Sequence, residues 1–181
     1  FLSKMEKVLG GMEEAGQRAG GRVFQNEEWV KTCQNWKEKY PVVLPKHYED
    51  KDHANVYAFI KELSRRLDEG QVTVVGNGSA CVVGSHGYEI KKDQRFIINS
   101  AIASMGYDLP AAIGAAVAEF GDEALNGRSL GKKVKDIILV TGDGSIQMNI
   151  QELQTIIHHK MPIKIFIINN SILGDNLLSP I

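Results

Sequence analysis

The stretch from residue 142 to residue 170 constrains the fold more than any other part of the chain. It follows an apolar run, Ile137–Val140, and opens with the turn sequence Gly142-Asp143-Gly144-Ser145. Pro162 ends the segment that comes next, and a second apolar run, Ile163–Ile168, follows it. Short apolar runs bounded by turn residues are typical of buried parallel strands. The stretch therefore predicts a strand–turn–helix–strand unit, and ligands of open α/β sheets bind at the carboxyl ends of the strands.

The residues between this turn and Pro162 predict one amphipathic helix. Asn149 and Glu152 have the spacing of a capping box, with Asn in place of Ser or Thr. We therefore expect Asn149 to cap the helix and the two histidines to lie near its carboxyl end. The apolar positions that recur at helical spacing are Ile150, Leu153 and Ile157, extended by Gln154 and Met161.

The polar residues at the ends of the two runs suit a metal-bridged diphosphate. Gly142 and Gly144 allow the backbone to approach a ligand closely, and amides at the start of a helix favour phosphate. Asp143 and Asn170 supply hard oxygen ligands of the kind that Mg²⁺ or Ca²⁺ prefers. The same residues also suit an ordinary turn and an ordinary strand end.

Two sequence blocks resemble one enzyme family. The first block has the form GDG-x24-NN, because 24 residues, 145–168, lie between Gly144 and Asn169. The second block, residues 103–115, reads ASMGYDLPAAIGA, with Asp108 where the family usually has glycine. Both resemble the cofactor motifs of thiamine diphosphate enzymes, in the branch of acetolactate synthase and 2-oxoacid decarboxylases. The resemblance covers roughly residues 54–170.

The order of the expected elements predicts an α/β domain with a mostly parallel sheet and helices on both faces. Residues 54–181 form this domain, and residues 1–53 are expected to be the remnant of a preceding domain and its connector. Phe1 is not an initiator methionine, so we expect a cut or missing segment before it, and we expect the carboxyl end to be incomplete. The remaining expected elements are a helix at 56–67, strands at 72–75 and 95–99, and a helix at 109–120.

The resemblance implies a set of site residues. The metal ligands would be Asp143, Asn170 and the carbonyl of Ile172, although the sequence after Asn170 departs from the family pattern. Met105 would be the apolar residue on which the cofactor folds, and a core methionine is the alternative for it. The implied cofactor contacts are Asn77, Gly78, Ser79, Ala103, Met105, Gly142, Gly144 and Ser145; a plain tight turn is the alternative for Asn77 and Ser79.

The resemblance also implies the chemistry and the partners. Thiamine diphosphate and Mg²⁺ would be the cofactors, and a small-molecule 2-oxoacid would be decarboxylated and, in a synthase, joined to a second carbonyl compound. The glutamate that activates the cofactor would come from another domain, so no catalytic residue is expected in this chain and the chain alone should be inactive. We expect a homo-oligomer, a dimer or tetramer, or a partner subunit that carries the missing domain.

The composition and the sequence pattern indicate which partners are not expected and in which compartment the protein is expected. The chain has 21 Lys and Arg against 22 Asp and Glu, which gives no basic excess for nucleic acid or an anionic membrane. No apolar stretch approaches the length of a membrane span, and no signal peptide opens the chain. Cys33 and Cys81 lack metal-ligand spacing, so we expect reduced core thiols in a cytoplasmic protein.

Other functions remain open at this point. One is a non-catalytic nucleotide- or phosphate-binding α/β module, although neither GxGxxG nor GxxxxGK[ST] occurs. Another is a separate small subunit of a two-chain decarboxylase. His86 follows the first glycine-rich turn and is an alternative catalytic residue. An aromatic stripe at Trp29, Trp36 and Tyr40 is expected to serve packing, with ligand binding as the alternative.

Overall fold

The computed structural model describes residues 27–50, 52–121 and 135–170. The chain divides into two units between Pro41 and Val42, and the first unit contains the helix α2 (Glu27–Lys39). The rings of Trp29 and Trp36 meet edge to face at 5.5 Å on this helix, and both are exposed. The domain boundary expected after residue 53 stays a prediction.

The two cysteines have different surroundings. Cys81 is buried, as expected of a core thiol, but Cys33 is exposed on α2. The expectation of a core thiol at Cys33 is therefore wrong, because α2 is the one element of its unit among the described residues and no sheet of that unit covers it.

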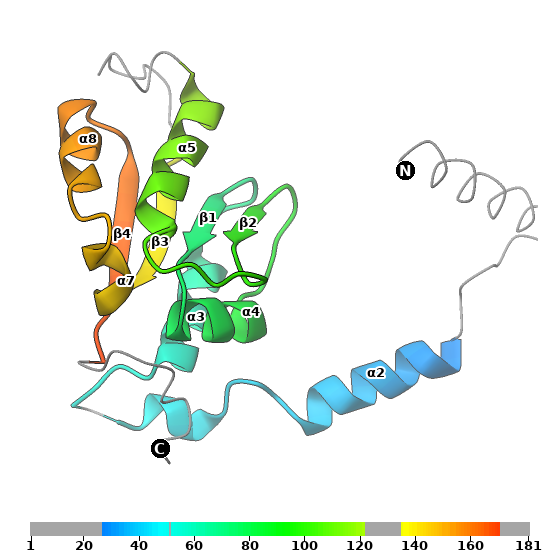
Figure 1. Ribbon diagram of the computed structural model, residues 1–181. Helices are drawn as coiled ribbons and strands as arrows, with labels where there is room; N and C mark the ends of the chain where they lie inside the picture. Colours follow the sequence, from blue (N-terminus) through cyan, green and yellow to red (C-terminus); the bar gives the residue numbers. More distant parts are fainter. Residues whose placement is uncertain (1–26, 51, 122–134, 171–181) are drawn as a thin grey trace, which may run out of the picture. The chain divides into compact units, whose positions relative to one another are not determined.

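A parallel sheet forms the centre of the second unit (Figure 1). Its strands lie in the order β2-β1-β3-β4, and every neighbouring pair is parallel. The fold class expected from the sequence is confirmed, and each strand lies where it was expected, to within two residues at its ends. The strands are β1 (Val72–Val75), β2 (Arg95–Ile98), β3 (Ile137–Gly142) and β4 (Ile163–Ile168).

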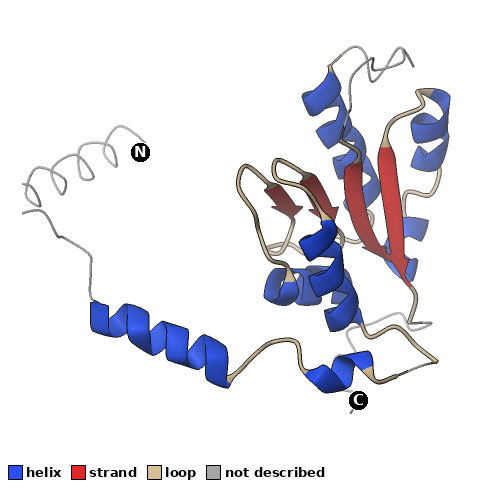
Figure 2. Ribbon diagram, turned by 180° about the vertical axis from the view of Figure 1, so that it is seen from behind, coloured by secondary structure: helices blue, strands red, loops and turns tan. Residues whose placement is uncertain are grey.

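Helices cover both faces of the sheet (Figures 1 and 2). Side chains alternate along a strand, so Ile137 and Leu139 point into one core and Ile138 and Val140 into the other. The first core contains residues of α5 (Asp108–Phe120), α7 (Asp143–Gln147) and α8 (Glu152–His158). The second contains residues of α3 (Val56–Arg66) and α4 (Ser79–Gly87), and the short 3-10 helix η1 (Pro45–Tyr48) contacts α3.

A local side-chain contact explains where α3 begins. Asn55 caps α3, because its side-chain oxygen accepts from the backbone N–H groups of Tyr57 and Ala58 at 3.0 and 3.3 Å.

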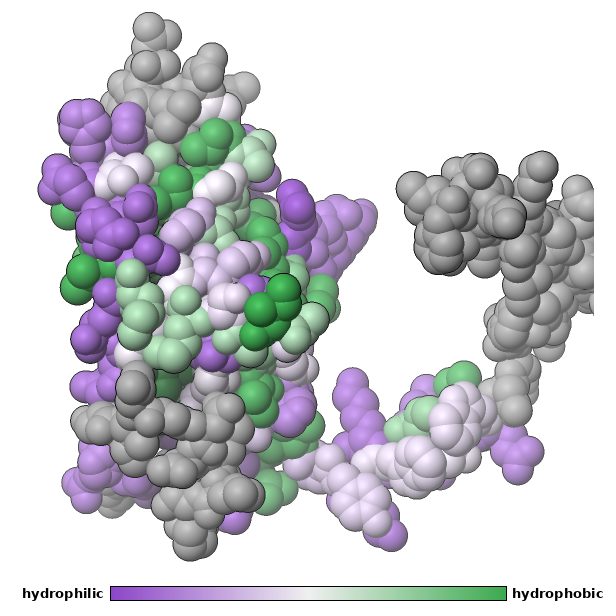
Figure 3. All heavy atoms as spheres, in the orientation of Figure 1, coloured by the Kyte–Doolittle hydropathy of each residue, from purple (hydrophilic) through white to green (hydrophobic). Residues whose placement is uncertain are grey.

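The outer side of α5 is rich in Ala and Gly, and apolar residues lie over this helix on the face shown in Figure 3. None of the helices among the described residues is long and apolar enough to cross a membrane.

Two expectations about the helices are wrong. The turn after β1 leads into the helix α4, which the sequence pattern did not predict. The helix expected between Asn149 and Pro162 is the shorter α8, and the preceding turn contains a second short helix, α7, that was not predicted. Asn149 does not cap α8, because its side-chain amide donates to the carbonyl oxygen of Gly106 instead.

The connections that follow β1 and β3 diverge at the carboxyl ends of the strands. The chain leaves β1 towards α4 on one face, whereas it leaves β3 towards α7 on the other face. Because β1 and β3 are neighbours and parallel, their two loops diverge from the same edge. This point of diverging connections is where open α/β sheets bind ligands.

Candidate functional site

Three loops form the candidate site at the carboxyl edge of the sheet. The first, Gly76–Gly78, joins β1 to α4; the second, Asn99–Tyr107, joins β2 to α5; the third is the junction of β3 and α7 at Gly142 and Asp143. Gly76 donates its N–H to the carbonyl oxygen of Val140 at 2.8 Å, which ties the first loop to β3. The predicted cofactor contacts after β1 and after β3 therefore start from adjacent strands.

The two side chains predicted to bind metal follow neighbouring strands. Gly142 pairs with Ile168, so Asp143 is one residue beyond this pair on β3 and Asn170 is two residues beyond it on β4. Neighbouring strands lie about 4.8 Å apart. Asp143 is partly buried and accepts from the N–H of Gly144 at 3.0 Å. Ile172, the third predicted ligand, lies outside the described residues.

The donor set at these strand ends suits a hard cation. Within the described part of the chain, no three His, Cys, Asp or Glu side chains lie close enough together to hold a metal ion. One carboxylate and one amide oxygen are nevertheless the ligand types that Mg²⁺ takes when phosphate and water complete its octahedron. Asp143 and Asn170 can therefore hold such an ion together with a bound diphosphate.

Asp108 is a buried carboxylate beneath the first loop. It has no exposed surface, its Oδ1 accepts from the N–H of Leu109 at 3.0 Å, and its Oδ2 accepts from the hydroxyl of Thr141. A Cβ atom at Gly76 would overlap this carboxylate, so glycine is needed there. Asp108 thus joins the start of α5 to the ends of β1 and β3. The sequence marked Asp108 as a departure from the family pattern, but its role was missed.

The second loop presents an apolar side chain to solvent. Met105 is 40% exposed, so the alternative of a core methionine does not describe it. Ala103 has a φ of 55°, in the left-handed region that non-glycine residues rarely adopt, and its N–H donates to the carbonyl oxygen of Asn99 at 2.9 Å. Strained residues of this kind cluster at ligand sites. Both residues are predicted cofactor contacts.

Ser145 and Asn149 connect the second loop to the third. The N–H of Gly106 donates to Ser145 Oγ at 2.9 Å, and Asn149 Nδ2 donates to the carbonyl oxygen of Gly106 at 2.6 Å. Ser145 is 4% exposed, so its hydroxyl serves this internal contact. The sequence did not indicate this use of Asn149, because the partner lies 43 residues earlier in the chain.

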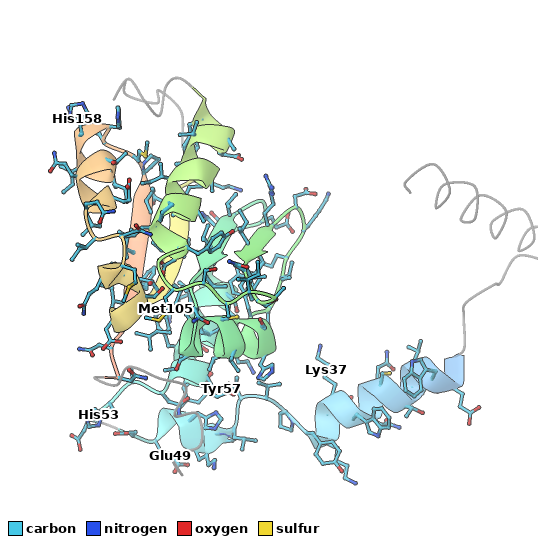
Figure 4. The ribbon with its side chains drawn as sticks, viewed as in Figure 1. Lys37, Glu49, His53, Tyr57, Met105 and His158 are labelled. Atoms are coloured by element: carbon cyan, nitrogen blue, oxygen red, sulfur yellow. The ribbon has the colours of Figure 1, made fainter. Side chains whose placement is uncertain are left out.

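Two histidines and a surface groove lie away from the three loops that form the candidate site. Figure 4 shows Met105 near the start of α5 and His158 at the far end of α8, so His158 is remote from the site. His86 lies exposed in the last turn of α4, at the opposite end of that helix from Ser79. A shallow groove of about 370 Å³ lies at the opposite edge of the sheet, with Gln71, Asp136 and Lys164 in its lining.

Comparisons with known proteins bear on this arrangement. The family model described as "Thiamine pyrophosphate enzyme, C-terminal TPP binding domain" matches residues 76–175, more than half of the chain. The acetolactate synthase large subunit of Cyanidium caldarium is 32% identical over 171 residues, which cover 92% of this chain and 25% of that protein.

Two further relatives are also acetolactate synthase large subunits. The acetolactate synthase large subunit of Porphyra purpurea is 34% identical over 142 residues, 78% of this chain and 21% of that protein. The large subunit of acetolactate synthase isozyme 1 of Escherichia coli K12 is 26% identical over 147 residues, 81% of this chain and 23% of that protein. The chain thus spans a quarter or less of the length of these three relatives.

Proposed function

The chain belongs to the thiamine pyrophosphate enzymes, as a C-terminal TPP binding domain, and we propose that it holds the diphosphate and Mg²⁺ of a 2-oxoacid carboligase or decarboxylase. The proposed enzyme is of the acetolactate synthase type, because the relatives described above are acetolactate synthase large subunits. When bound, thiamine diphosphate supplies a carbon nucleophile for the substrate carbonyl and an electron sink for decarboxylation.

One observation carries the proposal. The parallel register brings the end of β3, with Asp143, beside the end of β4, with Asn170, next to the point where the loops after β1 and β3 diverge. A carboxylate, an amide and glycine-containing loops at these strand ends are the groups that a metal-bridged diphosphate requires.

Each loop has its own task in this proposal. Asp143 and Asn170 hold the metal, with the Ile172 carbonyl as the third proposed ligand. Backbone amides at Asn77, Gly78, Ser79, Gly142, Gly144 and Ser145 hold the phosphate oxygens. The Gly144 amide contacts Asp143 Oδ1 in the structure, so this amide also orients the carboxylate. Ala103 and Met105 orient the ring end of the cofactor, because a fixed backbone and an exposed apolar side chain restrict its conformation.

The remaining parts of the active site would lie elsewhere. We place the glutamate that activates the cofactor on another domain, in a homo-oligomer or in a partner subunit, so this chain alone should be inactive. A cytoplasmic location is part of the proposal.

Titration calorimetry with thiamine diphosphate tests the proposed site. The longest native form of the protein is titrated with Mg²⁺ and, separately, with chelator, and the Asp143→Ala variant is treated in the same way. We expect binding that requires Mg²⁺ and is lost in Asp143→Ala. Asp136→Ala is the matched control, because Asp136 precedes the same strand at its other end and pairs with Lys164 on the surface.

Two results would contradict the proposal. The first is unchanged affinity in Asp143→Ala, which would remove Asp143 from the metal site. The second is tighter binding of a dinucleotide or nucleoside phosphate than of thiamine diphosphate, which would favour the non-catalytic nucleotide-binding module. Coexpression and pull-down with candidate partners would distinguish a separate small subunit from a homo-oligomer.

A further inference from the structure

We propose that Ser145 and Asn149 are positioning residues that lock the two halves of the cofactor site at a fixed separation. One half is the junction of β3 and α7, with Asp143; the other is the loop that carries Ala103 and Met105. The inference rests on the proposed function, because it assigns the two halves to the diphosphate end and the ring end of one cofactor.

Both backbone polar groups of Gly106 are held by side chains of the α7–α8 segment. Its N–H donates to Ser145 Oγ at 2.9 Å, and its carbonyl oxygen accepts from Asn149 Nδ2 at 2.6 Å. Gly106 is buried, so neither group can exchange this partner for water. The loop is therefore fastened at the residue that directly follows Met105.

The packing around Gly106 allows little adjustment. Its φ is 79°, and a Cβ atom there would lie 2.6 Å from Met148 Cβ and 2.9 Å from Asn149 Nδ2. The backbone of Gly106 thus lies directly against the side chains of Met148 and Asn149, at a distance that no larger residue permits. Two hydrogen bonds and this close approach fix the loop against α7.

Fixing the loop matters because one ligand must contact both halves. A ligand that spans two mobile segments loses affinity to the entropy of ordering them, and a preformed arrangement removes that cost. Inorganic pyrophosphate has no ring end, so it would contact only the half with Asp143. Weakening the lock should therefore lower the affinity for thiamine diphosphate and leave the affinity for pyrophosphate nearly unchanged.

The test compares these two ligands in three variants. The longest native form is titrated with thiamine diphosphate and with pyrophosphate, both with Mg²⁺, in the wild type, Asn149→Ala and Ser145→Ala. Loss of one buried hydrogen bond should weaken thiamine diphosphate binding about tenfold in either variant, and the pyrophosphate affinity of Asn149→Ala should stay within about twofold of the wild type. Gln147→Ala is the control, because it loses one hydrogen bond in α7, to the Asp143 carbonyl oxygen, without affecting Gly106; it should match the wild type.

The outcomes separate this inference from the proposed function. Equal losses for both ligands, or no loss for either, in a wild type that binds thiamine diphosphate would overturn the inference alone. A wild type that binds pyrophosphate but not thiamine diphosphate would overturn the proposed function and the inference with it. Circular dichroism checks that each variant folds, and Asn149→Ala, which changes a partly exposed residue, decides the question if Ser145→Ala does not fold.

Discussion

Replacing Gly106 with alanine should destabilise the domain strongly. The loss should exceed that at a glycine that also has a positive φ but is not closely packed. The left-handed backbone conformation costs a non-glycine residue about 1–2 kcal/mol. The new methyl would also lie 2.6 Å from Met148 Cβ, which belongs to the backbone-proximal part of that side chain and cannot swing away. Overpacking of this kind costs about 1–3 kcal/mol.

The total expected for Gly106→Ala is therefore about 2–5 kcal/mol, a large share of the roughly 5–15 kcal/mol that stabilises a typical domain. Gly121→Ala is the comparison, since Gly121 has a φ of 58° and no atom of the described residues lies within 4 Å of the position of a Cβ. That variant should lose only a conformational part, about 1–3 kcal/mol, because its ψ of −143° lies in a region that is adopted almost only by glycine.

Urea unfolding followed by circular dichroism measures both variants against the wild type. Any loss of stability in Gly106→Ala beyond that in Gly121→Ala reports the steric overlap at Gly106, which alone should cost about 1–3 kcal/mol. A third variant, Gly114→Ala, lies in a helix with open space around it and should stabilise the domain by about 0.5–1 kcal/mol. If Gly106→Ala lost no more stability than Gly121→Ala, the close approach of the loop to α7 and α8 would be refuted.

Two further predictions concern the backbone conformation of Ala103 and the phenol group of Tyr88. Ala103→Gly should raise the free energy of unfolding by up to about 1 kcal/mol, because glycine adopts the left-handed conformation of residue 103 without strain; a loss of stability in urea unfolding would count against that strain. Burial raises the pKa of Tyr88 above 10.0, although its hydrogen bond with Thr73 partly opposes the shift. The unfolded state then releases the phenol proton first, so this contribution to stability is present below about pH 10 and is lost as the pH rises through the folded-state pKa. Urea unfolding at several pH values between 8 and 11 measures the free energy of unfolding. Its decrease with rising pH should be smaller in Tyr88→Phe than in the wild type.

The strands were predictable because their residues carry the pattern locally. Ile137–Val140 and Ile163–Ile168 are apolar runs between strong breakers, and each forms a strand of the central sheet. Residues 109–120 likewise form most of α5. In these segments local preference and tertiary packing favour the same structure.

The helix α4 was missed because packing, rather than local preference, forms it. Its sequence contains Gly84, Gly87 and two valines, which are poor helix formers. A Cβ atom at Gly84 would lie 3.3 Å from the ring of Phe96, so the glycine allows α4 to lie closely on β2. A glycine that is a helix breaker in the sequence is thus a packing requirement in the fold.

The candidate site was predicted in its parts but not in its connections. The motif positions indicated Asp143, Asn170 and Met105, whereas nothing in the order of residues links Gly106 to Asn149 or Asp108 to Thr141. These contacts join residues 33–43 positions apart. Single-sequence patterns report on neighbours within a turn or a strand, so hydrogen bonds of this range become visible only in three dimensions.

The position of β4 at the border of the sheet has a consequence for handling the protein. Among the described residues, β4 pairs with β3 alone, and a strand that is paired on one side only can offer its other backbone donors and acceptors to another strand. Its sequence IKIFII combines high strand propensity with a single charge, at Lys164, which is the composition of segments that stack into cross-β fibrils. Lys164 is exposed and acts as a gatekeeper against such stacking. Concentrated solutions of the chain should therefore be more prone to fibril formation when an uncharged residue replaces Lys164.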